Sequence, residues 1–486
     1  MAASSRKCER SLTAGGVANG WTVGGHRPPL QLDWRFQRCA FLLTRSAQTA
    51  YISFDPKFSE GTSGQEGKIA DEERSMDSKK ASRRKFLKGG AAAAAVGAIQ
   101  SASAQTPPAA KRSLKDEVAY GERSHYVTSV RVAVLERPSP DEFGLTFHVL
   151  TPLQDQVGII TPSSLHFVGT HRGAIVPDID PREYRFLLHG MVDRPLEFTL
   201  EELKRFPSVS RVHFLECLGN RAKVDHKTVQ QTHGLTSCSE WTGVPLSVLL
   251  KEVGVQKGAN WVVSEGAEEV KGAGSIPLAK AMDDCLVAYG QNGEPIRPQN
   301  GFPVRLIVPG FEGIYNTKWL RRIKVVDHYY MTYNDYGHIS KDPKVAALNL
   351  QWGPKSVITF PSGGQTLPGP GLYQITGLAW SGGGAVRKVE ISTDGGHTWK
   401  DAEIRGQVHR MAHTRFGMTW KWEGQQCVLQ SRCTDELGQV QPTRAQLAKF
   451  FNQPADYYHT HGVPGTDNMI QPWRIAADGS VSNAIA

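Results

Sequence analysis

From about residue 346 onward, the sequence consists of short stretches in which apolar and polar residues alternate, and this pattern constrains the fold most. Such stretches cover residues 372–380, 386–392 and 418–422, and glycine-rich turns lie between them. Alternation with a period of two is typical of strands with one buried face, and frequent turns without a helical pattern favour two packed sheets. We therefore predict an immunoglobulin-like β-sandwich over residues 346–486, with a mostly irregular segment from Gln453.

The region before it, residues 141–345, alternates between strand-like and helical patterns, which predicts an α+β domain. One helix is expected over residues 198–206, because Thr199 is a suitable N-cap and Glu202 follows it three residues later. A second helix is expected from Pro245. The expected strands cover residues 184–190, 211–215, 261–264 and 304–308. Residues 105–140 are polar and contain proline, and we expect them to form an arm that packs on the rest.

The basic charge of the chain is concentrated at its N-terminal end. The formal net charge is +9, from 56 basic and 47 acidic residues. Residues 1–104 contain 16 basic and 9 acidic residues, which leaves 40 and 38 in the remainder, a net of only +2. A surface that binds nucleic acid needs a concentration of positive charge. The remainder lacks that excess, so we exclude nucleic acid as a partner.

An export signal is predicted within residues 76–104. The run SRRKFLK at 82–88 precedes a weakly apolar run at 89–99, and Ala-Ser-Ala at 102–104 resembles a cleavage site. The paired arginines indicate twin-arginine export to the periplasm, with a mature protein that begins near Gln105. The apolar run is too short to span a membrane. Because this signal starts only after Met76, we interpret residues 1–75 as a mis-assigned extension, with a genuine extension as the alternative.

Cys217 lies between an apolar strand and a Gly-Asn turn, and three roles are open to it. An unpaired cysteine is often a buried apolar residue. The neighbouring Arg221 and Lys223 would favour the thiolate, which attacks electrophiles and binds metals. A nucleophile would need a histidine base, and a zinc site would need further ligands at regular spacings that the sequence does not show. The residues alone therefore leave a filler, a nucleophile and a metal ligand as alternatives.

Five segments occur in an order that resembles the sulfite oxidase family of molybdenum enzymes. They are CLGNR at 217–221, LTSCSEWTGVPL at 235–246, NGEP at 292–295 with GFPVR at 301–305, PGFEG at 309–313, and KWLRR at 318–322. Within this family, the sequence is most similar to the molybdenum subunits of sulfane dehydrogenases from thiosulfate-oxidising bacteria. The stretches that carry this similarity are 176–182, 378–382, 389–396, 440–445 and 473–481.

The resemblance implies a molybdopterin-binding domain followed by a dimerisation domain, with Cys217 as the protein ligand of molybdenum. A soft thiolate suits such a centre. The residues implied to bind molybdopterin are Thr170, His171, Arg305, Asn316, Thr317 and Lys318, and those implied at the substrate pocket are Arg221, Trp241 and Tyr336. Arg305 and Lys318 could alternatively be ordinary surface cations. Trp241 and Tyr336 could alternatively be packing residues without a role at the substrate pocket.

Two departures from the family pattern concern the substrate. Gly169 and Ala222 stand where sulfite oxidases have arginines around the oxyanion. Fewer cations indicate a site for sulfane sulfur on the cysteine of a carrier protein rather than for free sulfite. The sequence has no haem or iron–sulfur cysteine pattern, so the resemblance implies a c-type cytochrome subunit as electron acceptor, in a homodimer or heterotetramer. The alternatives are a sulfite dehydrogenase, a sulfoxide reductase, or an exported binding or assembly protein that has lost catalysis.

Overall fold

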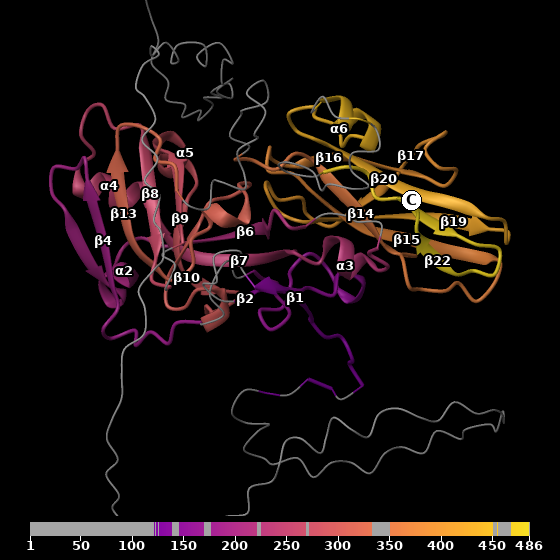
Figure 1. Ribbon diagram of the computed structural model, residues 1–486, viewed down its shortest axis with the longest axis horizontal. Coiled ribbons are helices and arrows are strands. Elements are labelled where there is room, and N and C mark those ends of the chain that lie inside the picture. The colour runs from indigo at the N-terminus through magenta and orange to yellow at the C-terminus, as the bar shows by residue number, and fades with distance from the viewer. Residues whose placement is uncertain are drawn as a thin grey trace, which may run out of the picture. The chain divides into compact units, whose positions relative to one another are not determined.

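The computed structural model describes residues 121, 123–124, 126–138, 145–169, 176–220, 225–268, 272–332, 350–450, 454 and 468–485. All of them lie in one compact unit that covers Pro108–Ala486 (Figure 1). The predicted extension at 1–75 and the predicted export signal at 76–104 fall outside the described residues. Among the described residues, no helix is long and apolar enough to cross a membrane.

The described part begins with a three-stranded antiparallel sheet of β1 (Val132–Pro138), β2 (Leu145–Leu150) and β3 (Val168–Gly169). Arg131, just before β1, donates a hydrogen bond to the carbonyl of His166, which anchors the end of the predicted arm. The register of the sheet places His148 opposite Gly169. Two residues that are 21 positions apart in the sequence are therefore brought together by strand pairing.

Two five-stranded sheets form the α+β part. In one sheet the order is β11-β10-β7-β6 with β12 beside β10, and in the other it is β5-β4-β13-β8-β9. The strands are β4 (Arg185–Gly190), β5 (Leu196–Thr199), β6 (Val209–Glu216), β7 (Thr236–Pro245), β8 (Trp261–Gly266), β9 (Ala273–Pro277), β10 (Leu286–Gln291), β11 (Glu294–Pro295), β12 (Arg305–Ile307) and β13 (Leu320–Val326). Helix α4 (Leu246–Val253) contacts β4 of one sheet and β7 of the other, while α5 (Leu278–Asp283) contacts β8 and β9 (Figure 1).

Both predicted helices of this region are confirmed. Helix α2 (Leu200–Arg205) starts after Thr199, whose hydroxyl accepts a hydrogen bond from the backbone of Glu202, while the Glu202 carboxylate accepts one from the backbone of Thr199. This reciprocal capping satisfies two backbone donors that the first helical turn leaves unpaired. The second helix is α4, which follows Pro245 and buries Leu246, Leu249 and Leu250. The short α3 (Val229–His233) has the same kind of cap.

The second part is a β-sandwich, as the alternating pattern predicted. One sheet has the order β14-β15-β19-β18 and the other β17-β16-β20-β21-β22. The strands are β14 (Lys355–Phe360), β15 (Gly371–Trp380), β16 (Val386–Ser392), β17 (Lys400–Asp401), β18 (Glu403–Arg405), β19 (Thr414–Trp422), β20 (Cys427–Asp435), β21 (Trp473–Ile475) and β22 (Val481–Asn483). Apolar residues from both sheets, such as Val357 and Ile391, form one core between them.

One expectation for the second part was wrong. It contains a helix, α6 (Arg444–Phe450), where no helical pattern was recognised. The described residues of the final segment from Gln453 are mostly irregular, as expected, but they also supply β21 and β22 to the larger sheet. Both are strands of three residues, which are too short to show an alternating pattern in the sequence.

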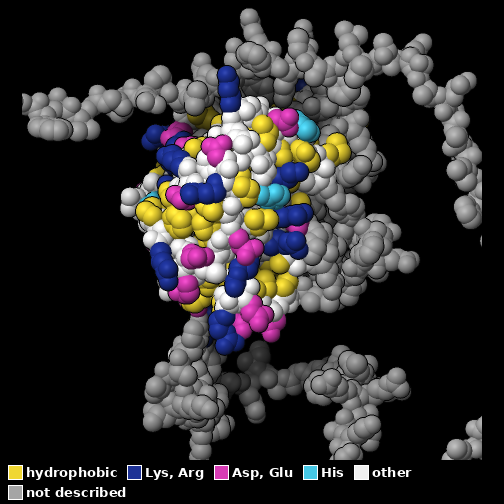
Figure 2. Space-filling model, turned by 90° about the vertical axis from the view of Figure 1, so that its left-hand side faces the viewer, with side chains coloured by type: hydrophobic (Ala, Val, Ile, Leu, Met, Phe, Trp, Pro, Cys, Tyr) yellow, Lys and Arg dark blue, Asp and Glu magenta, His cyan; other side chains and the backbone are white. Residues whose placement is uncertain are grey.

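Charges of both signs are mixed on the face shown in Figure 2, where lysines and arginines lie among aspartates and glutamates. Ion pairs on the described surface include Arg194 with Glu252 and Arg322 with Glu265. This mixture agrees with the small net charge of the chain after residue 104.

The two parts share buried residues. Phe214 of β6, Val229 of α3 and Cys238 of β7 belong to the same apolar cluster as Val357 and Trp380 of the sandwich. The backbone N–H of Phe214 donates to the carbonyl of Met411, so even the edge of β6 pairs with the second part. The α+β part and the sandwich are therefore joined by a continuous core.

A close backbone contact lies where the two parts meet. The N–H of Trp352 donates to the carbonyl of Gly310 at 2.9 Å, and the N–H of Gly382 donates to the carbonyl of Trp352 at 3.0 Å. A Cβ atom on Gly382 would lie 2.2 Å from the carbonyl oxygen of Gly310. No side chain fits at this position unless the two backbones move apart.

Replacing Gly382 with alanine is therefore expected to destabilise the protein. Overpacking at a buried site costs about 1–3 kcal/mol, and a clash with backbone leaves little room for relaxation. Urea unfolding of the purified variant measures the change. Gly369→Ala is the matched control, because a Cβ there would meet nothing within 4 Å. Equal stability of the two variants would contradict the prediction.

Candidate functional site

Cys217 lies in a tight turn directly after β6, and its side chain is 6% exposed. Two backbone hydrogen bonds stabilise this turn, one from the N–H of Cys217 and one to its carbonyl. The N–H of Cys217 donates to the carbonyl of Leu235 at 3.0 Å, and the N–H of Asn220 donates to the carbonyl of Cys217 at 2.9 Å. The side chain of Asn220 accepts a hydrogen bond from the N–H of Leu235 at 2.9 Å. The Gly-Asn turn thus anchors the cysteine to the residue that precedes β7.

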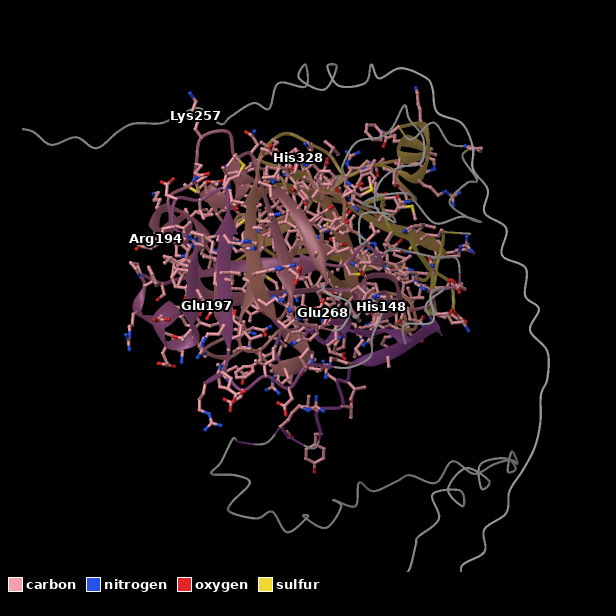
Figure 3. The ribbon with its side chains drawn as sticks, turned by 60° about the vertical axis from the view of Figure 1, so that its left-hand side comes forward. His148, Arg194, Glu197, Lys257, Glu268 and His328 are labelled. Carbon is pink, nitrogen blue, oxygen red and sulfur yellow. The ribbon has the colours of Figure 1, made fainter. Side chains whose placement is uncertain are left out.

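Two of the residues that border the Cys217 sulfur come from the N-terminal sheet. The Nε2 atom of His148 lies 3.9 Å from Sγ. A Cβ atom on Gly169 would also lie 3.9 Å from Sγ, and 3.4 Å from the His148 ring. Sequence reasoning identified Gly169 as the position of a missing arginine but did not identify His148, which is 69 residues from Cys217 along the chain. Figure 3 labels His148 on its strand.

Arg305 is a buried cation, which excludes the alternative of an ordinary surface residue. Its side chain on β12 is 4% exposed and donates to the carbonyls of Asn300 at 2.7 Å and Asn316 at 3.0 Å. Its guanidinium lies 5.0 Å from the ring centre of Trp241. The Nε atom has no hydrogen-bond partner within the described residues. Burial lowers the pKa of Arg305 to about 9.

Lys318 brings a second positive charge toward the cysteine. Its ammonium donates to the carbonyl of Gly169 at 2.9 Å and lies 4.4 Å from the ring of Trp319. Although the side chain is partly exposed, the ammonium is surrounded by protein atoms. This desolvation, together with the nearby charge of Arg305, lowers the pKa of Lys318 to about 7. In the described part of the chain, neither cation forms an ion pair with a carboxylate.

Trp241 is fully buried on β7 and packs beneath Arg305. Its indole N–H donates to the carbonyl of His213 at 3.3 Å, and its ring meets His166 edge-on at 5.8 Å. His166 is also buried, and burial lowers its pKa to about 3, so that the ring is neutral. Trp241 thus fills the packing role that the sequence left open, and its ring forms the floor under Arg305.

Asn316 and Thr317 shape the loop around the two cations. The side chain of Asn316 accepts from the N–H of Val308 at 2.6 Å and donates to the carbonyl of Glu312 at 3.0 Å. The hydroxyl of Thr317 lies 2.7 Å from that of Ser264. Both side chains are engaged within the protein, so their contribution to a ligand would come through the backbone.

The structure thus brings Cys217, Trp241, Arg305 and Lys318 together from four separate segments. The other residues expected at the site are Thr170, His171, Arg221 and Tyr336, and they lie outside the described residues. The remaining cysteine near the site, Cys238, is fully buried, and burial raises the pKa of its thiol to about 12. Its thiol is therefore in the protonated form, as expected for a packing residue.

The chemistry of this arrangement fits a cofactor that combines a soft metal with a phosphate. The Cys217 sulfur offers one soft ligand. The two cations beside it, with an unpartnered Nε on Arg305, offer charge-assisted donors for an anion. An anionic group would also offset the burial that depresses both pKa values.

The titration of Lys318 gives the cofactor-free protein an unusual pH dependence. Its pKa falls from 10.5 to about 7 on folding, so between these values the unfolded chain binds one proton more than the folded chain. The free energy of unfolding is therefore expected to rise with pH in this window, by up to about 1.4 kcal/mol per unit. Urea unfolding at pH 7, 8 and 9 measures the slope. Lys318→Met should remove this contribution, and equal slopes in both proteins would contradict it.

Two domain families and several known proteins are similar to this chain. Residues 173–334 match the oxidoreductase molybdopterin binding domain, and residues 346–460 match the Mo-co oxidoreductase dimerisation domain. The NADH nitrate reductase 1 of Arabidopsis thaliana is 38% identical over 306 residues, which are 54% of this chain and 33% of the relative. The NAD(P)H nitrate reductase of Hordeum vulgare is 37% identical over the same shares. The chain spans about a third of the length of these curated relatives.

A solved structure covers more of the chain. It is the crystal structure of the sulfane dehydrogenase SoxCD from Paracoccus pantotrophus, with 35% sequence identity and a TM-score of 0.70. The match covers 80% of this chain and 100% of that one. Together with the two domain matches, this similarity shows that the chain belongs to the sulfite oxidase family of molybdenum oxidoreductases and has its molybdopterin-binding and dimerisation domains.

Proposed function

We propose that this protein oxidises sulfane sulfur bound to the cysteine of a carrier protein, as the SoxC-like molybdenum subunit of a sulfane dehydrogenase. The observation that carries the proposal is the environment of position 169. A glycine there contributes no arginine side chain beside the Cys217 sulfur, and the ring of His148 occupies the adjacent space. A small doubly charged anion such as sulfite would lack that arginine, because Arg305 and Lys318 would be engaged by the phosphate of molybdopterin. The similarity to the sulfane dehydrogenase SoxCD supports the same substrate class.

The residues of this chain have separate tasks in the proposed reaction. Cys217 would bind molybdenum, and Arg305 and Lys318 would hold the phosphate of molybdopterin. When bound, the cofactor would accept two electrons for each oxygen atom that passes from water to sulfur. Each such transfer also releases two protons. Cys217 and Trp241 are buried, so the protein side of the site is shielded from bulk solvent.

The first experiment is the measurement of molybdenum and pterin in the purified mature protein. One molybdenum per chain is expected, and its absence from correctly matured protein would overturn the proposal.

The second experiment measures turnover with three substrates. A carrier-bound persulfide and free sulfite are each tested with cytochrome c as electron acceptor, and nitrate is tested with a reduced viologen as electron donor. We expect turnover of the persulfide. Robust turnover of sulfite or nitrate alone would assign a different substrate to the same cofactor.

The proposed partners follow from the same assignment. They are a SoxD-like c-type cytochrome subunit as electron acceptor and a SoxYZ-like carrier protein as substrate, with residues 346–460 as the dimerisation domain. Co-expression with such a cytochrome should yield a stable complex on gel filtration. Recovery of each protein alone would count against this partner.

We also propose export to the periplasm through the twin-arginine pathway, on the basis of Arg83 and Arg84. Cell fractionation should recover a protein that begins near Gln105 in the periplasm. Changing both arginines to lysine should retain the precursor in the cytoplasm. Export of that variant at the normal rate would contradict the proposed route.

A further inference from the structure

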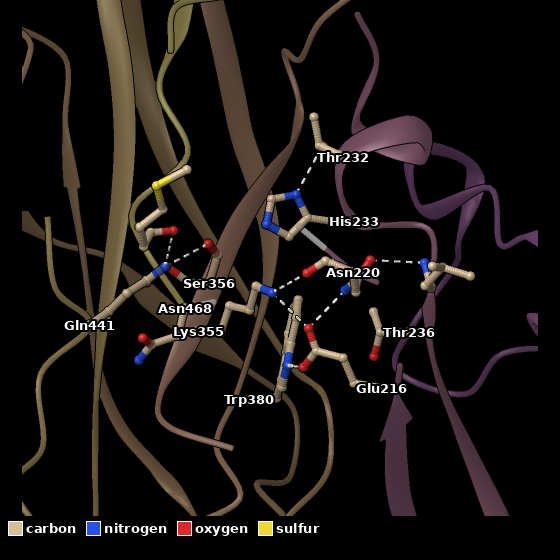
Figure 4. Close-up of polar contacts among 12 residues, drawn as sticks. Glu216, Asn220, Thr232, His233, Thr236, Lys355, Ser356, Trp380, Gln441 and Asn468 are labelled. Carbon is tan, nitrogen blue, oxygen red and sulfur yellow. Dashed lines mark hydrogen bonds and ion pairs between the residues drawn. The ribbon is translucent and has the colours of Figure 1, made fainter. Parts of the chain in front are cut away.

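A buried ion pair joins the dimerisation domain to the turn that contains Cys217. Lys355 is the first residue of β14 and is 1% exposed. Its ammonium donates to Oε1 of Glu216 at 2.7 Å and to the carbonyl of Asn220 at 2.8 Å (Figure 4). Glu216 is the residue immediately before Cys217, and Asn220 is three residues after it. One side chain from the second domain therefore contacts both ends of the cysteine turn.

The carboxylate of Glu216 accepts hydrogen bonds from three side chains. Its Oε1 also accepts from the side chain of Asn220 at 2.8 Å, and its Oε2 accepts from the indole N–H of Trp380 at 2.6 Å (Figure 4). Trp380 belongs to β15, so the sandwich contributes two of the three side chains bound to Glu216. With 0% exposure, the carboxylate has no access to solvent, and its position is determined by these partners.

Stability alone is a weak reason for such an arrangement. Removing two charges from water costs several kcal/mol per ion, and apolar replacements of a buried pair are often neutral or stabilising. The pair instead fixes a geometry. Glu216 and Asn220 are joined directly and through Lys355, so that the backbone of residues 216–220 is closed into a ring of hydrogen bonds around Cys217.

We propose that Lys355 is a positioning residue that orients the Cys217 thiolate toward molybdenum, so that the dimerisation domain controls the geometry of the metal site. This inference rests on the proposed role of Cys217 as the metal ligand. Residues that orient a metal ligand without contacting the metal change affinity or activity by about 10–100-fold when they are altered. Lys355 would act on the ligand through the backbone of Asn220 and the side chain of Glu216.

The test uses the molybdenum-loaded protein and a double variant, Glu216→Leu with Lys355→Met, which removes both charges and keeps similar side-chain volumes. We expect a folded protein that retains molybdenum, with an altered Mo(V) electron paramagnetic resonance spectrum. The kcat should fall by about 10–100-fold while KM changes little, because the substrate pocket itself is unaltered. Ser356→Ala is the matched control. It removes a buried hydroxyl from the next residue of β14, whose hydrogen bonds stay within the sandwich.

A normal spectrum and a normal kcat in the double variant would overturn the inference and reduce the pair to an interdomain contact. If the double variant does not fold, Glu216→Gln with Lys355→Met is measured instead, because glutamine keeps the shape and an acceptor for Trp380. An altered spectrum would support the inference, and a normal spectrum would again overturn it. Absence of molybdenum from the wild-type protein would instead refute the proposed function, so the two failures are distinguishable.

Discussion

Changing Cys217 to serine is expected to lower kcat by more than about 100-fold, because it removes the proposed protein ligand itself rather than a residue that only orients it. The fold and the bound pterin should be retained, since the phosphate would be held by Arg305 and Lys318 and a serine fits the same space. Steady-state turnover, pterin content and thermal unfolding of the purified variant measure the three properties. A fourth measurement is the absorbance from sulfur-to-metal charge transfer, which should change when the Cys217 sulfur is removed.

Cys427→Ser serves as the control, because this thiol lies at the start of β20 and is only partly buried. It should keep its activity and its absorbance. A Cys217→Ser variant with normal turnover would refute the ligand assignment. Loss of pterin together with activity would instead show that the cysteine is needed to retain the whole cofactor.

The second large effect concerns stability. Changing Lys355 to methionine alone is expected to lower the free energy of unfolding by about 3–5 kcal/mol, because it leaves the fully buried carboxylate of Glu216, whose pKa is already raised by burial, without its cation. Adding Glu216→Leu should recover most of that loss. A double-mutant cycle by urea unfolding gives the coupling between the two residues.

The exposed ion pair of Arg194 and Glu252 provides the comparison. Its atoms lie 2.7 Å apart, the same distance as in the buried pair, but its side chains are 62% and 47% exposed. Arg194→Met should therefore change stability by less than about 1 kcal/mol. If Lys355→Met costs no more than Arg194→Met, the buried carboxylate takes up a proton or finds another partner, and the predicted penalty is wrong.

Local signals in the sequence predicted most of the regular structure. Thr199 and Glu202 identified the start of α2, and the alternating stretches identified the strands of the sandwich. A local signal was also present for the helix that was missed. The backbone N–H of Thr443 donates to the side chain of Gln446, and the N–H of Gln446 donates to the Thr443 hydroxyl, so α6 has the same type of cap.

The site was predicted only in part, because much of it depends on contacts between distant segments. The motifs identified Cys217, Trp241, Arg305 and Lys318, which the structure places together. His148 reaches the cysteine through the pairing of β2 with β3, and no motif marks that register. Lys355 contacts Glu216 across 139 residues. One indication in the sequence that Glu216 has a buried partner is that this charged residue lies inside an apolar run.

The continuous core beneath β6 and β7 limits how far this protein can be treated as modular. Phe214, Val229 and Cys238 would be exposed to solvent if the chain were cut between the two domains, and the sandwich would lose the surface that covers Trp380. We expect the two domains to melt in a single transition and to fail as separately expressed fragments. Exchange of a dimerisation domain between relatives would therefore require the grafting of the facing residues of β6, α3 and β7 as well.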